Sequence, residues 1–457
     1  MAGGLMQLVA YGAQDVYLTG QPKVTFFQAV YKRHTNFAME NIQQTVNGTP
    51  SNGGRVSVTI ARNGDLVGDM YIRLQPTQLN SSNLTSTNAN IDMNWVAERS
   101  IADIELTIGG QRIDKHYQTW WRLYAELFLS ESEKINYGKL TSSSSSLYDT
   151  TNPNSVYLPL LFFFNRNPGL YLPLIALQYH EVRLDFDLTS YFTSYFGSTS
   201  AVFEVWANYV YLDTEERRRF AQKGHEYLIE QVQHTGGDSI TASAALPGPG
   251  AQTIRLSFNH PVKELIWCYT NTTSTAYNSL WNFSTSAANV NVTCACTPSL
   301  AGAALPHTMG APRIFANTYA LTGATSALTS NIGWVEEGTS NTAVGSGYAV
   351  EVGPLYNFKL VLNGQDRFKE QQGKYFNQYQ PYVYHSGVPY PGVYCYSFAL
   401  QPEEHQPTGT CNFSRIDNAQ VAINMKGGYT TPLQKMFAVN YNILRIQSGM
   451  GGLAFSN

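Results

Sequence analysis

The sequence predicts an all-β protein made of two similar domains in tandem, because one short motif occurs twice and β-type patterns surround both copies. The motif reads ELTIGGQRIDK over residues 105–115 and KLVLNGQDRFK over residues 359–369. Each copy has an alternating strand, a turn that ends on Gly-Gln, and a charged segment that leads into an aromatic-rich stretch. The copies are identical at four of eleven positions, which suggests that one β-domain is repeated.

Length and composition favour a protein that assembles with other copies of itself. The chain has 457 residues, enough for about two to four domains of ordinary size. Charged residues make up 13% of it, against about 25% in a typical soluble domain. Tyr and Phe are abundant, with 30 and 22 residues. Low charge and many aromatic residues are typical of interface cores, although a polar all-β protein from a harsh environment has the same composition.

The charge distribution argues against direct nucleic-acid binding. The formal net charge is −3 and no Lys or Arg precedes Lys23, whereas a coat that packs a genome by direct contact usually has a basic arm. The one basic cluster, Arg217, Arg218 and Arg219, directly follows two glutamates. We therefore interpret this cluster as a salt-bridge group in a rigid connector that holds the two domains in register.

The N-terminal half predicts a leader and a first domain. Residues 1–22 form a Gly-rich leader in which Leu5, Leu8 and Val9 have helical spacing, so we expect either a short docking helix or a frayed terminus. Residues 117–128 have the apolar spacing of a surface helix with one buried face. The first domain, residues 23–213, has strand patterns at 24–30, 56–60, 70–74, 101–108, near Tyr157, and at 182–188 and 202–212.

The C-terminal half repeats this order. Residues 214–226 contain the densest charge run in the chain, and we place the connector there. Residues 270–350 form a Ser/Thr/Ala/Gly-rich stretch, and a loop of that length is usually functional or disordered. The second domain, residues 227–457, has strand patterns at 227–233, 254–258, 265–269, 356–362, 393–400, 419–423 and 441–446. About eight strands with long loops in each half predict two tandem eight-stranded jelly rolls with short helices in their loops.

No motif predicts an enzyme, a cofactor site or a metal site. His180 and His225 are each followed by Glu but lack the second His that a zinc-peptidase helix requires. Cys294 and Cys296 have no His nearby, and nucleophile-elbow and phosphate-loop motifs are missing from the sequence. The glycines of residues 449–452 (GMGG) predict a tight turn. The paired carboxylates of a glycoside hydrolase have no fixed spacing in the sequence. The alternative is therefore a carbohydrate-binding or glycan-cleaving protein built on tandem jelly rolls.

The expected compartment is reducing, and the sequence predicts no membrane span. The five cysteines are an odd number at irregular spacing, which is not a disulfide framework. The N-terminus has neither a positive region nor a continuous apolar core, so we expect no signal peptide. The most apolar region, residues 157–177, is interrupted by NRNPG at 165–169, whereas a span needs about 20 continuous apolar residues.

Asn-x-Ser/Thr triplets mark candidate glycosylation sites in the two Ser/Thr-rich loops. These sites are Asn80, Asn83, Asn271, Asn282 and Asn291. The alternative is that loops rich in Asn and Ser produce such triplets by chance. Because we expect no signal peptide, ordinary secretory glycosylation is not expected at them.

Long sequence blocks spread over the whole chain carry a family resemblance. They are MAGGL at the N-terminus, QLVAYGAQDVYLTG (7–20), TNFA (35–38), RNGD (62–65), IGGQRIDKHY (108–117), LPLIALQYHEV (172–182), HEYLIEQ (225–231), LNGQDRF (362–368), GTCNFSRIDNA (409–419), NILRI (442–446) and SGMGGLA (448–454). In these blocks the chain resembles the major capsid proteins of nucleocytoplasmic large DNA viruses, especially the chlorella-type phycodnaviruses of algae. It departs from them in loops 77–94, 141–155 and 270–350.

The resemblance implies two jelly rolls in one chain, three chains in a pseudo-hexagonal capsomer, and many capsomers that tile an icosahedral shell over an internal membrane. The implied partners are the chain itself as a homotrimer, neighbouring capsomers, and minor capsid and vertex proteins, with the membrane nearby but not entered. The implied location is the virion capsid, assembled in the host cytoplasm. A minor shell protein with the same fold is a further alternative. Since loops tolerate growth where sheets do not, we expect loops 77–94 and 270–350 to face outward and the leader to lie on the inner side.

Overall fold

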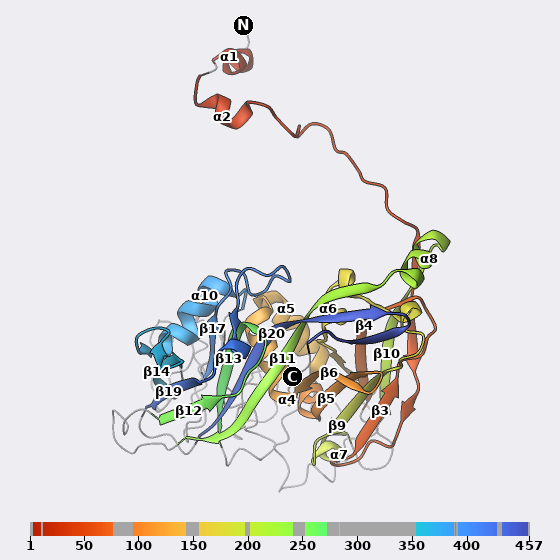
Figure 1. Ribbon diagram of the computed structural model, residues 1–457, viewed down its shortest axis with the longest axis vertical. Coiled ribbons are helices and arrows are strands. Elements are labelled where there is room, and N and C mark those ends of the chain that lie inside the picture. Colours follow the sequence, from red (N-terminus) through yellow and green to blue (C-terminus); the bar gives the residue numbers. More distant parts are fainter. Residues whose placement is uncertain are drawn as a thin grey trace, which may run out of the picture. The chain divides into compact units, whose positions relative to one another are not determined.

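The computed structural model describes residues 3–10, 12–75, 95–142, 155–196, 202–240, 252–271, 283, 353–387, 389, 392–426 and 432–455. It comprises two units, an arm of residues Met1–Phe37 and a body of residues Ala38–Asn457 (Figure 1). The arm holds two short helices, α1 (Gly3–Val9) and α2 (Asp15–Thr19), in the leader where the apolar spacing predicts a helix. The strand predicted over 24–30 is wrong. That segment is irregular and exposed, because a strand needs a partner for its backbone groups and the described part of the arm offers none.

The first half of the body folds into two sheets. One has the strand order β1-β10-β4-β7, with β8 beside β4, and the other has the order β2-β3-β9-β5-β6. The strands are β1 (Phe37–Gln44), β2 (Val46–Asn47), β3 (Arg55–Thr59), β4 (Leu66–Gln75), β5 (Ile101–Ile108), β6 (Gln111–Tyr117), β7 (Val156–Pro159), β8 (Leu172–Pro173), β9 (Val182–Leu188) and β10 (Val202–Leu212). The short helices are α3 (Val96–Arg99), α4 (Gln118–Phe128), α5 (Glu131–Thr141), α6 (Phe163–Arg166), η2 (Pro168–Leu170), η3 (Leu174–Ala176) and α7 (Phe192–Phe196).

Helix α8 (Thr214–Gln222) leads into the second half, which again has two sheets. Their strand orders are β11-β20-β13-β17, with β18 beside β13 and β21 beside β20, and β12-β19-β14-β15, with β16 beside β14. The strands are β11 (His225–Ser239), β12 (Gln252–Leu256), β13 (Pro261–Asn271), β14 (Leu355–Leu362), β15 (Gln365–Asp366), β16 (Gln371–Gln372), β17 (Val393–Ser397), β18 (Cys411–Asn412), β19 (Ala419–Met425), β20 (Pro432–Gln447) and β21 (Met450–Leu453). The helices are η4 (Tyr375–Tyr379), α10 (Gln380–Tyr384) and η5 (Phe413–Arg415). None of the helices in the described ranges is long and apolar enough to cross a membrane.

The two halves have the same topology. We number eight main strands in each half along the chain, counting β2 with β3 and leaving out the side strands β8, β16, β18 and β21. In both halves one sheet then has the order 1-8-3-6 and the other the order 2-7-4-5. This arrangement, in which the last strand inserts between the first and the third, is that of a jelly roll. The prediction of two tandem eight-stranded jelly rolls is confirmed.

The repeated Gly-Gln motif forms the same hairpin in both barrels. Strands β5 and β6 pair up to Ile108 and Gln111, and β14 and β15 pair up to Leu362 and Gln365, so each turn has two residues. The four turn residues all have positive φ, at 58° and 81° for Gly109 and Gly110, and at 50° and 79° for Asn363 and Gly364. Two positive φ angles in a two-residue turn define the type I′ hairpin, for which Asn-Gly and Gly-Gly are favoured. Local backbone chemistry therefore explains why the motif occurs twice.

The GMGG segment forms another tight turn of this kind. Gln447 of β20 pairs with Met450 of β21, and the two residues between them, Ser448 and Gly449, have φ values of 55° and 81°. The turn sends β21 back along β20. There the backbone of Gly451 meets the first barrel, since its carbonyl oxygen lies 2.9 Å from Nδ1 of His180.

Strands β11 and β20 form a long antiparallel pair that extends into both barrels, and we call this pair the spine. Their pairing runs from His225 opposite Ile446 to Ser239 opposite Leu433. At one end Ile229, Leu444 and Ile446 lie in the apolar core of the first barrel. At the other end Met436 and Ala438 lie in the core of the second barrel, which Ile240, just past β11, also joins. Figure 1 shows the spine passing from one half of the body to the other.

The two hairpin turns give a matched test of the fold. Gly364→Ala adds only backbone strain, because no described atom lies within 4 Å of the added Cβ, and we expect a loss of about 1 kcal/mol. Gly109→Ala adds the same strain and a clash of the new Cβ with the His180 ring, so we expect a total loss of about 2–3 kcal/mol. Urea unfolding of the two variants measures the difference. Equal losses would contradict the packing of His180 against this turn.

Candidate functional site

The spine places a continuous seam of side chains between the two barrels, and this seam is the candidate functional site. Helix α4 of the first half lies against the sheet of the second half that contains β13, β17 and β20. The side chains that meet there are Trp95, Trp120, Leu123, Ala125, Leu127 and Tyr137 from the first half and Ile266, Cys268, Phe283, Val393, Cys395, Phe437 and Val439 from the second. All of them are buried. The seam thus resembles a third core.

The prediction of a surface helix with one buried face over 117–128 is wrong. Trp121 packs into the first barrel and Trp120 packs into the seam, so α4 buries two different sides. No residue of α4 is exposed. Apolar spacing identifies the helix, but it does not show that a second domain covers the other side.

Burying α4 requires its charges to be paired. The guanidinium of Arg122 lies 3.0 Å from Glu98 and 3.4 Å from Glu126, and it stacks 3.7 Å from the ring centroid of Trp95. Glu98 also accepts a hydrogen bond of 2.7 Å from the Tyr137 hydroxyl. Burial raises the pKa of Glu98 in spite of the opposing charge of Arg122. Arg122 therefore links three helices beneath the seam, and its removal would leave a buried carboxyl group without its cation.

A second polar cluster crosses the seam at Glu230 of β11. Its carboxylate lies 2.9 Å from Arg166 of the first half, and 2.5 Å from Lys263 of β13. His405 lies 3.7 Å away. Burial alone would raise the pKa of Glu230, but the nearby His405 ring and the charges of Lys263 and Arg166 outweigh it and lower that pKa to about 2. One carboxylate thus joins cations from both barrels.

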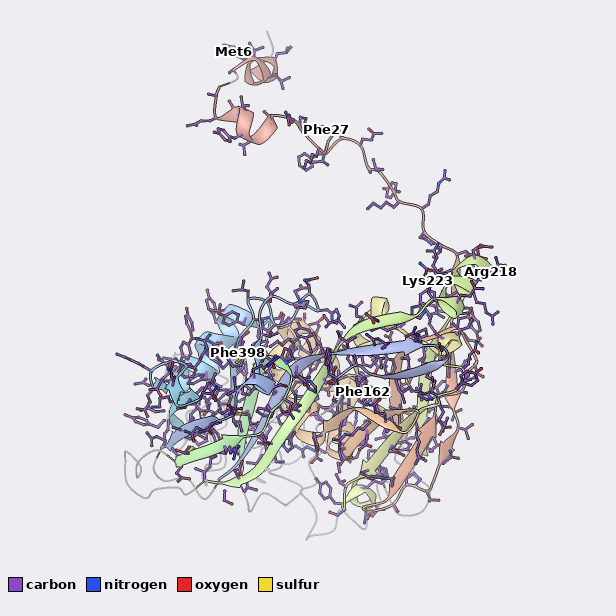
Figure 2. All side chains as sticks on the ribbon, viewed as in Figure 1. Met6, Phe27, Phe162, Arg218, Lys223 and Phe398 are labelled. Atoms are coloured by element: carbon purple, nitrogen blue, oxygen red, sulfur yellow. The ribbon has the colours of Figure 1, made fainter. Side chains whose placement is uncertain are left out.

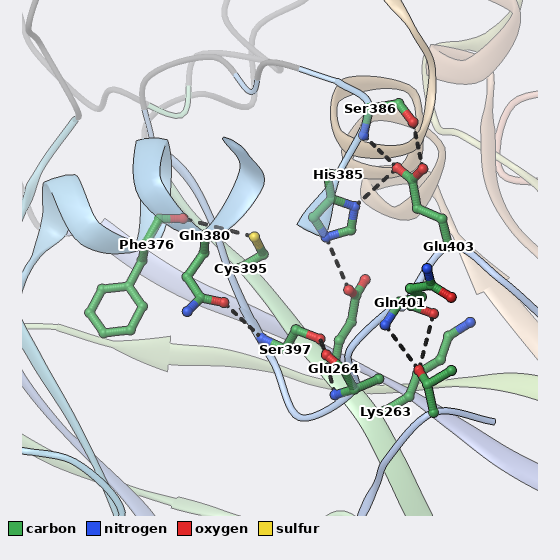
Figure 3. A network of polar contacts seen from close by, with 12 residues as sticks. Lys263, Glu264, Phe376, Gln380, His385, Ser386, Cys395, Ser397, Gln401 and Glu403 are labelled. Atoms are coloured by element: carbon green, nitrogen blue, oxygen red, sulfur yellow. Dashed lines mark hydrogen bonds and ion pairs between the residues drawn. The ribbon is translucent and has the colours of Figure 1, made fainter. Parts of the chain in front are cut away.

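A third polar cluster surrounds His385, directly after α10. Figure 3 shows His385 between two carboxylates, with Nε2 at 3.0 Å from Glu264 and Nδ1 at 3.4 Å from Glu403. Burial alone lowers the pKa of His385, but the charge of Glu264 outweighs it and holds that pKa well above its ordinary value. Two residues on, the backbone N–H of Gly387 donates to the Leu127 carbonyl at the end of α4, at 2.9 Å. The cluster therefore fixes the start of the segment after α10, and this backbone hydrogen bond holds that segment against the first half.

The sequence analysis did not identify these clusters. One signal was available, because β13 reads PVKELIWCYTN and places Lys263 and Glu264 inside an otherwise apolar strand. Charged residues in a buried strand need partners. Their partners come from positions far away in the chain, so sequence spacing could not supply them.

The predicted connector residues lie on α8. Arg217 Nε lies 3.0 Å from Asp65 of the first barrel, and Asp65 in turn accepts a hydrogen bond of 2.9 Å from the Leu212 backbone. Arg218 lies 3.6 Å from Glu215 of the same helix. Within the described ranges, the ion pairs of this cluster reach the first barrel and α8 itself. The role of the cluster in setting barrel register stays a prediction.

Most of the candidate glycosylation sites lie outside the described residues. These are Asn80, Asn83, Asn282 and Asn291, and nearly all of loops 77–94 and 270–350 lie outside them as well. Asn271 is the last residue of β13.

The described residues contain few features of a metal-binding or sugar-binding site. Within them, no group of three or more His, Cys, Asp or Glu side chains is placed to hold a metal ion. Of the tryptophans within the described ranges, Trp95, Trp120, Trp121 and Trp267 are at most 4% exposed and offer no face on which a sugar could stack, whereas Trp206 is partly exposed.

Comparisons with known proteins find the same kind of relative along nearly the whole chain. A family model described as large eukaryotic DNA virus major capsid protein matches residues 216–452, and a model of the major capsid protein N-terminus matches residues 25–213. The major capsid protein of Paramecium bursaria Chlorella virus 1 is 43% identical, with 100% of both chains covered. That of Phaeocystis pouchetii virus is 39% identical, also with 100% of both covered.

Solved structures give the same result. The chain matches a chain of the PBCV-1 virus capsid with a TM-score of 0.75 and 39% identity, covering 95% of this chain and 100% of that one. The Faustovirus major capsid protein matches with a TM-score of 0.63 and 12% identity, over 97% and 96% of the two chains. At that low identity the second match supports the fold alone.

Glu230 and Glu226 give a matched test of the seam, since both lie on β11. Glu230→Gln leaves Lys263 and Arg166 without their carboxylate, and we expect a loss of about 3 kcal/mol in urea unfolding. Glu226→Gln breaks a pair with Arg445 in which both side chains are more than half exposed, and we expect less than about 1 kcal/mol.

The pH dependence follows from the lowered pKa of Glu230. A carboxylate with a lowered pKa stabilises the fold fully above its ordinary value of 4.5, and loses that contribution as pH falls toward about 2. The wild type should therefore lose stability in this window more steeply than Glu230→Gln. Parallel curves for the two proteins would contradict the assigned role of Glu230.

Proposed function

Because the chain belongs to the family of large eukaryotic DNA virus major capsid proteins, and is a structural subunit of a virus capsid, we propose that three copies close into a pseudo-hexagonal capsomer and that capsomers tile an icosahedral shell. The observation that carries this proposal is the shared topology of the two barrels. Two similar barrels in one chain give six similar barrels in a trimer. Such a trimer can fill a lattice in which every unit has six neighbours.

The seam supports this role because a pseudo-hexagonal outline requires a fixed angle between the barrels. The spine, the apolar seam around α4 and the cluster at Glu230 each bind one barrel to the other. Interfaces between domains that are large and apolar resist relative motion. The two barrels of one chain therefore act as a single rigid building block.

The surface composition also supports assembly. A ring of three requires heterologous contacts, in which one surface of each copy meets a different surface of the next. Charged residues make up only 13% of the chain, which lowers the desolvation cost of such contacts. Tyr382 and Val383 of α10 and Tyr379 of η4 form an exposed apolar group, with Tyr382 at 86% exposure. They are candidate contacts to a neighbouring copy.

The finer assignments belong to the same proposal. The domains are the leader 1–22, the first jelly roll 23–213, the connector 214–226 and the second jelly roll 227–457. The subunit catalyses no reaction and needs no cofactor. Its partners are other copies, neighbouring capsomers, and minor capsid and vertex proteins, with an internal membrane nearby that it does not span and no direct contact with nucleic acid. It assembles in the host cytoplasm. Loops 77–94 and 270–350 face outward, and the asparagines of these loops carry any glycans.

Native mass measurement with low-resolution imaging of the purified chain tests the proposed trimer. We expect a stable trimer with a hexagonal outline at micromolar concentration. A monomer under these conditions would contradict self-assembly as an intrinsic property of the chain.

Arg217→Ala tests whether α8 must be held for assembly. The change removes the cation beside the buried Asp65, and we expect a loss of about 1 kcal/mol in stability together with a lower trimer yield. Arg219→Ala is the matched control, because it removes the same charge from the same helix. Equal trimer yields for both variants would show that the Arg217–Asp65 pair has no part in assembly.

A further inference from the structure

The arm exposes an unusual set of large apolar side chains. Two of its phenylalanines, Phe26 and Phe27, are 91% and 99% exposed, and Tyr17 and Tyr31 are 93% and 90% exposed. Further exposed apolar residues are Leu5, Met6, Leu8, Val9, Val16, Leu18, Val24 and Val30. Figure 2 shows the side chains of the arm, with Met6 and Phe27 labelled. Single exposed apolar residues are normal, but so many in one segment indicate a binding surface.

The same segment has a charge opposite to that of the rest of the chain. Residues 1–37 hold three basic side chains, Lys23, Lys32 and Arg33, and one acidic side chain, Asp15, for a formal charge of +2. The remaining residues carry −5, since the whole chain carries −3. Asp15 accepts a hydrogen bond of 2.8 Å from the Gly12 backbone, so its carboxylate is used within the arm. From residue 16 to residue 39 there is no acidic side chain.

We propose that the arm is a peripheral membrane-binding segment that inserts its aromatic and aliphatic side chains into the interface of an anionic lipid bilayer. Aromatic and aliphatic residues enter the boundary between headgroups and acyl chains, while nearby Lys and Arg side chains attract anionic headgroups. Lys32 and Arg33 directly follow Val30 and Tyr31, which places cations and apolar anchors within one short stretch. The inference rests on the proposed function in one respect only: the internal membrane is where the arm would meet lipid in the particle.

Two other kinds of partner fit the arm less well. Single-stranded nucleic acid would use the cations and the aromatic rings, but it offers nothing to aliphatic side chains such as Leu5, Leu8 and Val9. A groove on a protein would bury the aliphatic side chains, but the net charge of −5 on the rest of the chain is spread over the whole body and attracts the cations less than an anionic bilayer surface does. An anionic bilayer accounts for both features. The helices α1 and α2 have only seven and five residues, so they are too short to be stable alone and would be ordered on binding.

Vesicle flotation with the purified full-length chain tests the proposal. We expect the wild type to float with phosphatidylcholine vesicles that contain phosphatidylserine, and to bind them at least about tenfold more tightly than pure phosphatidylcholine vesicles. Two double variants should each lose this binding: Phe26→Ser with Phe27→Ser removes apolar anchors, and Lys32→Glu with Arg33→Glu reverses the charge. Added salt should weaken the wild-type binding.

A matched control reverses two exposed charges on the body, Lys369→Glu with Lys374→Glu, and should float like the wild type. The proposal is overturned if the wild type does not float, or if the arm variants float as well as the control. Protection of the arm from protease in the lipid-free trimer would also overturn it, because the arm would then dock on protein. Trimer yield of the same variants is read separately, so a failure of lipid binding is distinguishable from a failure of capsomer assembly.

Discussion

The pairing of β11 with β20 is the interaction on which the rest of the body depends. Strand β20 contributes Leu444 to the first apolar core and Met436 to the second, while β11 contributes Ile229 to the first and leads directly into Ile240 of the second. In an ordinary pair of tandem domains, each domain closes its own core and a linker joins them. Here the first and last strands of the second barrel continue into the first barrel. The two cores and the seam between them therefore form one packed unit.

The buried charges at the seam have a different role from the apolar contacts. Replacing a buried ion pair by well-packed apolar residues is often neutral or stabilising, so such pairs are weak evidence of stability. One of them does demand a fixed geometry, because Glu230 of the second barrel meets Arg166 of the first only when the barrels are correctly placed. Apolar side chains such as Leu123 tolerate small shifts. For a subunit that must present a fixed outline to its neighbours, we interpret the Arg166–Glu230 pair as a determinant of the angle between the barrels.

Local features of the sequence predicted the fold well, and non-local features explain the failures. The turns at Gly109–Gly110 and Asn363–Gly364 were predictable because positive φ restricts the residue types. The strand over 101–108 was predicted with the bounds that the structure has. The segment 24–30 has a strand-like composition but no partner in the arm, and α4 has a second buried side that its spacing does not reveal. The seam clusters join residues from separate elements, and no local pattern can bring together a pair such as Glu264 and His385, which lie more than 100 positions apart.

The spine also constrains how the protein can be made. A ribosome releases the chain from its N-terminus, so the strands of the first barrel emerge long before Leu444 and Ile446, which fill part of its core. Until nearly the whole chain has been synthesised, the first barrel has an open apolar gap, and chains in this condition are prone to aggregate or to bind chaperones. Premature termination leaves the first barrel without these side chains. The core of the first barrel is thus complete only when translation is nearly complete.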